Sequence, residues 1–578
     1  MKYHQVVVVG AGLAGLRAAI QCNMNNINVA VVSKVHPLRS HSLAAQGGIN
    51  ASLGNNLRGS NDAWEKHAFD TVKGSDYLAD QDAVQTMTRE AAECIYELDH
   101  WGCPFTRNDR GLIAQRPFGG AGFPRTCYAA DKTGHVLLHT LYEKSCQFEA
   151  NAERQNFVFY DEYFVVGVLS DGAKCHGVSI MNMATGELDV IRADAVVLAT
   201  GGAGRMYSNT TNALISTGYG MSLAYWKGVG LKDMEFIQFH PTTLVGTNIL
   251  MTEGCRGEGG FLTNNKGERF LVNYPDSAKA MEVAPRDIVS RNITRELLAG
   301  RGFGKNNAEY VNLDLRHLGE KRIITRLPGI RDISMNFSGV DPVNEPIPVQ
   351  PGNHYTMGGI DTDASCKTAV AGLFAAGECA CVSVHGANRL GGNSLLETIV
   401  FGKIAGDSAA KYVLGGGSSS VPEAEKLGKV DFAFVEDTRA KNGSLLPADI
   451  RDELTVTMAQ KVGIFRNKGH LQQAYDKVKE LQAKYRDIKV RYKGKRFNWD
   501  LMWALDLKGN LDVAEVVVAG ALAREESRGS HFRDDFPTRD DGKWLRHTVA
   551  KFDASSNAAK LDYKPVTLGV WEPKERKY

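Results

Sequence analysis

Three glycines near the start of the chain are the first residues whose spacing suggests chemistry. Gly10, Gly12 and Gly15 form a Gly-x-Gly-x-x-Gly pattern directly after the apolar run 6–9. Glycines at this spacing allow a tight turn and let the backbone approach a pyrophosphate at the N-terminus of the following helix. The pattern therefore predicts a dinucleotide-binding turn rather than a glycine-rich turn without a ligand.

One part of this fingerprint is missing. Dinucleotide-binding units usually carry an acidic residue about 20 residues further on, which binds the ribose. Here Ser33 and Lys34 occupy the end of the second β-rich run. Ser33 could hydrogen-bond a ribose and Lys34 could contact a phosphate, although their spacing alone requires neither.

The pattern of elements places this turn in a βαβ unit. Residues 6–9 and 27–32 are β-rich, and the segment between them has a helical pattern. Two later runs, 194–202 and 372–378, also end in glycine-rich turns and could be further strands of the same sheet. That arrangement makes residues 238–350 a large insertion, which holds most of the charged residues considered below.

The C-terminal part has a helical pattern after a flexible linker. A glycine and serine run at 415–420 marks the linker. Apolar residues then recur at helical spacing from Leu471 to Leu481. We interpret this stripe as packing within a helical bundle.

The composition excludes several classes of protein. The chain of 578 residues has 68 basic and 66 acidic residues, a net charge of +2, which offers no electrostatic surface for nucleic acid. No run of about 18 uncharged apolar residues could span a bilayer, so any membrane role should come through a partner. The ten cysteines are scattered without a Cys-x-x-Cys pair, so we expect free thiols and no metal or iron–sulfur site in this chain.

A longer set of motifs is more specific. The segment RSHSLAAQGGI at 39–49 resembles the covalent flavin-attachment segment of the succinate dehydrogenase and fumarate reductase flavoprotein subunits. Further matches follow in chain order, and the resemblance extends to about residue 550. They are ATGGAGR at 199–205, QFHPT at 238–242, TEGCRGEGG at 252–260, PRD at 285–287, HYTMGG at 354–359 and HGANRLGGNSL at 385–395.

The resemblance implies an α/β fold. We expect a Rossmann-like FAD-binding domain with an inserted α+β capping domain and a helical C-terminal domain. The first part of the FAD-binding domain would be 1–237, the cap 238–350 and the second part 351–414. The helical domain would be 421–540, followed by a C-terminal tail at 541–578.

The implied substrates are succinate and fumarate. Both are dianions, so their site needs cations and hydrogen-bond donors at both ends. Arg389 and His354 match the family's positions for one carboxylate, and His240 and Thr252 match those for the other. Taken singly, each histidine would more often be structural, and it is the joint match that favours binding.

Proton transfer is implied to involve three residues of the insertion. By resemblance Arg286 exchanges the substrate proton, although an arginine pKa above about 12 is poorly suited to a general base. As an acid toward fumarate, a cationic arginine has a proton to give and stabilises developing negative charge. Glu253 and Arg256 match the relay that reprotonates it. The residues alone would favour Glu253 as the base, and it remains the second choice.

The implied cofactor is FAD, attached covalently through His41. Glu378 matches the family's flavin-contacting acid, and Ser394 and Leu395 match backbone contacts to the ring. Tyr219 departs from the commoner family pattern, which has an FAD-contacting aspartate there. The expected cofactor-binding residues are Gly10, Gly12, Ala14, Gly15, Ser33, Lys34, Ser40, His41, Gly47, Gly48, Glu378, Ser394 and Leu395.

The leading hypothesis is therefore the flavoprotein catalytic subunit of a succinate:quinone oxidoreductase. It would pass electrons to a separate iron–sulfur subunit and on to quinone, held at the cytoplasmic side of the cell membrane through one or more membrane anchor subunits. One alternative is a soluble flavin oxidase of the L-aspartate oxidase type, which binds FAD non-covalently and lacks a histidine at position 41. Another is a non-catalytic flavin-binding module.

Overall fold

The β1–α1–β2 unit lies within a seven-stranded sheet of the computed structural model, which describes residues 1–151 and 156–577. Strand β1 (Lys2–Val9) pairs in parallel with β2 (Val29–Ser33) on one side and β9 (Leu188–Leu198) on the other. Residues 6–9 are buried, as expected for a parallel strand covered on both faces. The other strands are β6 (Phe157–Asp161), β7 (Tyr163–Ser170), β8 (Cys175–Asn182) and β16 (Leu373–Ala375).

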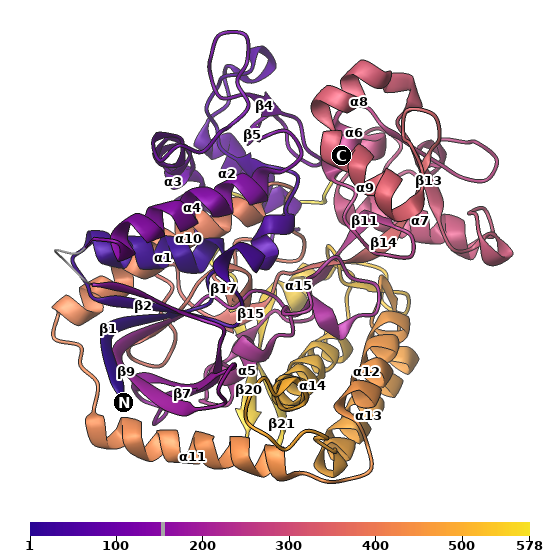
Figure 1. The fold of residues 1–578 in the computed structure, drawn as a ribbon. Helices are drawn as coiled ribbons and strands as arrows, with labels where there is room; N and C mark the ends of the chain where they lie inside the picture. The colour runs from indigo at the N-terminus through magenta and orange to yellow at the C-terminus, as the bar shows by residue number, and fades with distance from the viewer. Residues whose placement is uncertain (152–155, 578) are drawn as a thin grey trace.

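The two later glycine-terminated runs belong to this sheet, as the sequence suggested. Strand β16 pairs in parallel with β9, so segments far apart in the chain end at the same edge. Helices α1 (Leu13–Met24), α4 (Thr133–Glu149) and α10 (Asn393–Leu414) pack together over one face (Figure 1). Helices α2 (Trp64–Gly74) and α3 (Gln81–His100) adjoin them, and α5 (Tyr219–Tyr225) lies near the end of β9.

The insertion has its own sheet and core. Its strands are in the order β11 (Ile237–Leu244), β14 (Ile347–Thr356), β13 (Val311–Asp314) and β12 (Phe261–Thr263). One cluster of buried apolar side chains runs from Leu244 to Val349. The helices are α6 (Glu253–Gly257), α7 (Arg286–Leu298), α8 (Glu320–Arg326) and α9 (Pro328–Ser338). The domain boundary expected at residue 350 falls inside β14, so this strand runs across it.

Four long helices follow the linker. They are α11 (Val421–Ala440), α12 (Pro447–Lys461), α13 (Lys468–Lys484) and α14 (Trp499–Ala523). The stripe on α13 is buried at Leu471, Ala474, Val478 and Leu481, which confirms bundle packing. Helix α11 runs along β7, β8 and β9, while α12, α13 and α14 pack on one another (Figure 1). None of the helices in the described ranges is long and apolar enough to cross a membrane.

Part of the segment expected to be a tail is regular structure. Strands β20 (Arg546–Asp553) and β21 (Ala558–Pro565) form an antiparallel hairpin. Strand β20 also pairs with β10 (Leu231–Lys232), which precedes the cap. The full order of this second sheet is β17 (Ala380–Cys381), β15 (Gly359–Asp361), β10, β20 and β21.

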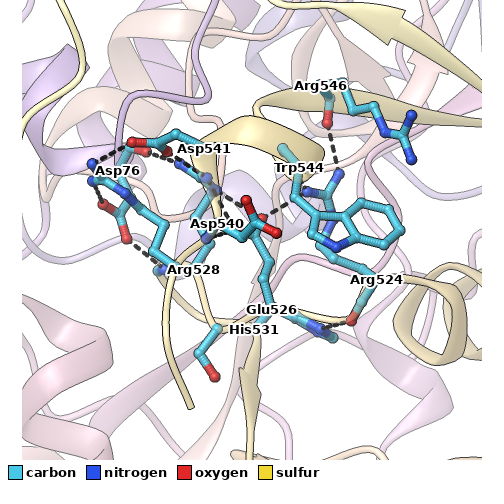
Figure 2. Close-up of polar contacts among 12 residues, drawn as sticks. Asp76, Arg524, Glu526, Arg528, His531, Asp540, Asp541, Trp544 and Arg546 are labelled. Atoms are coloured by element: carbon cyan, nitrogen blue, oxygen red, sulfur yellow. Dashed lines mark hydrogen bonds and ion pairs between the residues drawn. The ribbon is translucent and has the colours of Figure 1, made fainter. Parts of the chain in front are cut away.

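A buried ionic network holds the loop after α14 against the body of the protein (Figure 2). Arg524 donates to Glu235 (2.7 Å) and Glu526 (2.9 Å), and both charged partners are essentially unexposed. Arg528 makes two further bonds to Glu526 and one to the carbonyl of Asp76. Because Glu526 is shared by two fully buried guanidinium groups, its removal would leave both with a missing partner.

Glu526→Gln should therefore lower the free energy of unfolding by about 3–5 kcal/mol, measured as a fall of several degrees in the midpoint of thermal unfolding. Glu525→Gln is the matched control. Glu525 is adjacent in sequence but exposed, and it pairs with Lys543 at the surface, where an ion pair contributes about 0–1 kcal/mol. Equal shifts in the two variants would show that the network does not stabilise the fold.

Candidate functional site

One cavity of about 940 Å³ brings together the glycine turn, the end of β2, the cap and the N-terminus of α10. All but two of the residues expected at the site line it. The exceptions are Gly15 and Arg256. A cavity of this size with convergent polar groups is typical of a cofactor and substrate site.

Two positions of the glycine turn require glycine, because neighbouring backbone atoms approach them too closely for a side chain. Gly10 has a φ of +107°, and a Cβ there would lie 2.2 Å from the carbonyl oxygen of Ala199. A Cβ on Gly15 would lie 1.8 Å from the Gly10 oxygen, so this residue serves the packing of α1 against the turn. Gly12 begins α1 with no side-chain cap, and Gly12 and Leu13 line the cavity. A helix start of this kind favours an anionic phosphate.

The residues at the end of β2 are engaged within the protein. The Ser33 hydroxyl donates to the carbonyl of Val35 at 2.6 Å. The Lys34 ammonium forms an ion pair with Asp506 of α14. The sequence had suggested a ribose contact for Ser33 and a phosphate contact for Lys34. Their bonds to Val35 and Asp506 could not be predicted from the positions of these residues in the chain.

His41 lies at the start of the short 3₁₀ helix His41–Ala44 and lines the cavity. Burial lowers its pKa to about 4, so the imidazole is neutral at physiological pH. The backbone N–H of Ala213 donates to Nδ1 at 3.3 Å, and the side-chain amide of Asn212 lies 3.5 Å from Nε2. Ser40 and Ala14 line the same wall.

The segment after His41 packs closely against residues 116–118 and approaches Thr252 of the cap. A Cβ on Gly47 would lie 2.8 Å from the Phe118 ring, and Gly48 has a φ of +141°. Arg116, which the sequence analysis did not single out, is buried and donates to the carbonyl of Gly47. It thereby fixes the backbone of this segment.

Two irregularities in the pairing of β11 with β14 position His240 and His354. Gln238 pairs with Tyr355 and Phe239 with Asn353, so His354 is the extra residue of a β-bulge. A second irregularity follows His240. Bulges redirect side chains, and both rings line the cavity with centroids 5.0 Å apart.

Both histidines are neutral and available to a ligand. Burial, together with the nearby Arg286, holds the pKa of His240 well below its ordinary value. Burial and His240 do the same for His354. Nε2 of His240 is buried with no partner among the described residues. Thr252 caps α6 by accepting from the N–H of Gly254, which leaves its hydroxyl proton to donate.

Arg389 is a buried cation without a counterion. It is 2% exposed, and its side chain makes no hydrogen bond or ion pair with the described residues. The guanidinium lies 4.5 Å from the centroid of the Tyr355 ring. Burial, and then repulsion by Arg286, lower the pKa of Arg389 to about 9. Such a group is prepared for an anionic ligand.

Arg286 begins α7 and is held on two sides. Its Nε donates to Glu253 at 2.7 Å and its Nη1 to Gln238 at 3.1 Å. Burial alone would raise the pKa of Glu253, but Arg286, Arg256 and the hydrogen bonds from Arg286 and the Gly119 N–H hold it below its ordinary value. Glu253 is therefore ionised, and both of its oxygens are engaged.

The structure does not join Arg256 to this pair by a hydrogen bond. Its Nη1 donates to the carbonyl of Glu282, and Nε and Nη2 are buried without a partner among the described residues. Its influence on Glu253 is electrostatic.

Gln238 is the residue that sequence reasoning missed in this group. Its amide nitrogen donates to the carbonyl of Arg389 (2.8 Å) while its oxygen accepts from Arg286. One side chain thus connects the guanidinium of Arg286 to the backbone at Arg389. Its place two residues before His240 in a matching motif was the available signal.

The opposite wall comes from β16 and α10. Burial raises the pKa of Glu378 to about 7, and the N–H of Thr356 donates to it at 3.1 Å. Helix α10 begins after Gly392 with no side-chain cap and no acidic residue in its first turn. Ser394 and Leu395 line the cavity there, so the positive end of a 22-residue helix can stabilise negative charge on a bound group.

The chain matches known proteins along its whole length. An FAD binding domain matches residues 5–395, and the C-terminal region of fumarate reductase flavoproteins matches 451–578. The succinate dehydrogenase flavoprotein subunit of Rickettsia felis is 44% identical, over 97% of this chain and 95% of the relative. A quinol fumarate reductase chain of Escherichia coli has a TM-score of 0.95 at 42% identity, covering 100% of this chain and 99% of that one. A quinol–fumarate reductase solved with menaquinol molecules has a TM-score of 0.93 at 42% identity, covering 99% and 100%.

This chain belongs to the succinate dehydrogenase and fumarate reductase flavoprotein family. The cofactor of the cavity is accordingly FAD, and the residues present fit it. The glycine turn offers a phosphate site. Thr200, at the end of the turn after β9, keeps its hydroxyl buried without a partner among the described residues, and Glu378 and the α10 terminus can contact the ring system.

One departure from the common family pattern has a structural explanation. Tyr219, at the start of α5, is among the residues that line the cavity, but its hydroxyl donates to the carbonyl of Val166 at 2.9 Å. The ring packs on Phe164 and Trp226. Tyr219 therefore fills apolar space between β7 and α5 and supplies no acidic group.

The charge of Arg389 gives a pH dependence that can be measured. Because its pKa is about 9 in the ligand-free protein, the guanidinium is charged below that pH and loses its charge above it. The affinity for malonate, a small dianion, should be constant up to about pH 8 and fall as the pH rises through 9. Isothermal titration calorimetry from pH 7 to 10 would follow it.

Arg389→Ala is the companion variant. It should bind malonate at least tenfold more weakly at pH 7, since removing one partner of a buried charge pair costs about 2–5 kcal/mol, and should lose the inflection near pH 9. An unchanged dissociation constant would show that Arg389 does not contact the anion.

Proposed function

We propose that this chain is the flavoprotein catalytic subunit of a succinate:quinone oxidoreductase and that it interconverts succinate and fumarate in the cavity described above. The observation that supports this most directly is the unpaired, buried Arg389 next to the Arg286–Glu253 pair. A site with an excess of positive charge at one end and neutral donors at the other is complementary to a four-carbon dianion.

The geometry supports the binding roles that the family motifs imply. Arg389 and His354 hold one carboxylate, and His240 and Thr252 hold the other. Both histidines are neutral, so they act as hydrogen-bond partners rather than as cations. FAD, when bound, accepts or supplies the hydride.

Arg286 is the proton donor toward fumarate. Its Nε and Nη1 are held by Glu253 and Gln238, and Nη2 has no hydrogen-bond partner among the described residues, so Nη2 is the group left for the substrate. Glu253 is ionised, so it can accept a proton that enters from solvent and then pass that proton to the guanidine of Arg286 after Arg286 has protonated the substrate. Arg256 supports this exchange by its charge. Glu253 is less suited to act as the base directly, because both of its oxygens are already engaged.

We also propose that FAD is bonded covalently to His41. The imidazole is neutral and lines the cavity, and Nδ1 accepts from Ala213. Nε2 has only the longer, 3.5 Å contact with the Asn212 amide, so we propose that Nε2 forms the bond.

Electrons would leave through an iron–sulfur subunit, and membrane anchor subunits would connect it to quinone. Solved relatives are quinol–fumarate reductases, one with menaquinol molecules. The chain would then be peripheral, on the cytoplasmic side of the cell membrane.

Arg286→Lys tests the proton donor. Lysine keeps the charge but not the planar fork, so the variant should retain FAD and bind malonate while losing at least 99% of fumarate reduction. Arg295→Lys is the control, because Arg295 lies on the same helix, is half-exposed and contacts Asn292. Turnover of the Arg286 variant within a few-fold of the parent would remove Arg286 from proton transfer.

His41→Ser tests the covalent bond. The tether raises the flavin potential, which the oxidation of succinate requires, whereas the glycine turn does not depend on it. The variant should bind FAD, release it on acid precipitation, keep some fumarate reduction and lose succinate oxidation. His36→Ser, outside the cavity lining, should keep the flavin in the precipitate. Release of all flavin from the unaltered protein would exclude the bond.

A further inference from the structure

The adenosine end of the FAD cavity lacks an acid from the expected source. In dinucleotide-binding βαβ units an acidic side chain at the end of the second strand binds the ribose hydroxyls. Here that position has Ser33, whose proton is donated to Val35, followed by the cation Lys34. Tyr219, at the start of α5, likewise donates its hydroxyl proton to Val166.

The structure brings a carboxylate to this place from a different domain. Asp506 of α14 lines the same cavity as Gly10, Gly12 and Ser33. Its side chain is 4% exposed, and its Oδ2 forms the ion pair with Lys34. The Thr217 hydroxyl donates to Oδ1 at 3.3 Å.

Asp506 is fixed in position and still able to accept. A carboxylate has about four acceptor sites, and the described residues use two of them. Lys34 neutralises its charge and lies over the rings of Phe164 (5.1 Å) and Trp503 (5.6 Å), which makes burial of the pair tolerable. Asn510, one turn further along α14, donates to the carbonyl of Thr217 at 2.7 Å and holds the loop that contacts Asp506.

We propose that Asp506 is the ribose-binding acid for FAD and that α14 of the helical domain therefore completes the cofactor site. The proposal rests on the assignment of the cavity to FAD and not on the succinate–fumarate reaction. It has a structural consequence, because the cofactor then joins the central sheet to the helical bundle.

The test uses nucleotides that differ only in the ribose. His41→Ser protein freed of flavin is titrated with ADP, 2′-deoxy-ADP and 3′-deoxy-ADP. A hydrogen bond to a charged acceptor should make at least one deoxy nucleotide bind about ten- to a hundred-fold more weakly than ADP. With Asp506→Asn added, the ratio of the deoxy-nucleotide dissociation constant to that of ADP should fall to within about threefold of one.

The ratio separates the hydroxyl contact from other effects of the change. Asp506→Asn leaves Lys34 without its partner, which alters the affinity for every phosphate-bearing nucleotide equally and cancels in the ratio. If the single change prevents folding, Asp506→Asn combined with Lys34→Gln removes both charges, and the same loss of discrimination is expected.

Asp512→Asn is the matched control. Asp512 lies on the same helix, is equally buried at 4% exposure and bonds Lys508, Trp226 and Gln482, but it does not line the cavity. This variant should lose stability and keep the ratio. A ratio retained in the Asp506 variant, or lost equally in the Asp512 variant, overturns the proposal. Absent succinate oxidation would instead count against the proposed function and leave the ratio unaffected.

Discussion

A buried positive charge that the protein leaves without a counterion is the constraint on which this structure depends. Burying a guanidinium is unfavourable unless an acid or ordered acceptors compensate it. Arg286 is paired directly with Glu253, whereas Arg389 lies over the face of Tyr355, is repelled by Arg286 and interacts with Glu378 and Glu253 without a hydrogen bond or ion pair among the described residues. The surrounding fold must hold the guanidinium in place, and under the proposed function a dicarboxylate would supply the missing negative charge.

The surroundings achieve this by contacts between segments that are distant in the chain. Gln238 reaches from β11 both to Arg286 at the start of α7 and to the backbone at Arg389. The buried network around Glu526 fixes the loop that follows α14. Precision at the site therefore depends on packing among the cap, the FAD-binding sheet and the C-terminal region.

Much of the fold and the membership of the site could be predicted from the sequence. The glycine turn follows local rules, because the φ of Gly10 and the packing of Gly15 exclude other residues, and the stripe from Leu471 to Leu481 has the period of a helix. The ordered motifs located the two arginines and two histidines that the structure brings into one cavity. Their roles in binding and proton transfer remain proposals.

Other features could not be predicted, because they arise only when remote segments meet. The pairing of Lys34 with Asp506 joins the second strand to the helical bundle. The hairpin of β20 and β21 depends on the remote strand β10. The bulge at His354 is a matter of register, which residue types alone do not determine.

The pairing of β11 with β14 also has a mechanical consequence, since these two strands contain both covalent connections of the cap. A rotation of the cap about the β11–β14 pair would carry Arg286 away from Arg389. It would leave His240 and His354 together, because His240 belongs to β11 and His354 to β14. One histidine of each proposed carboxylate site would thus stay in place through each opening, while Arg286 moved away and returned.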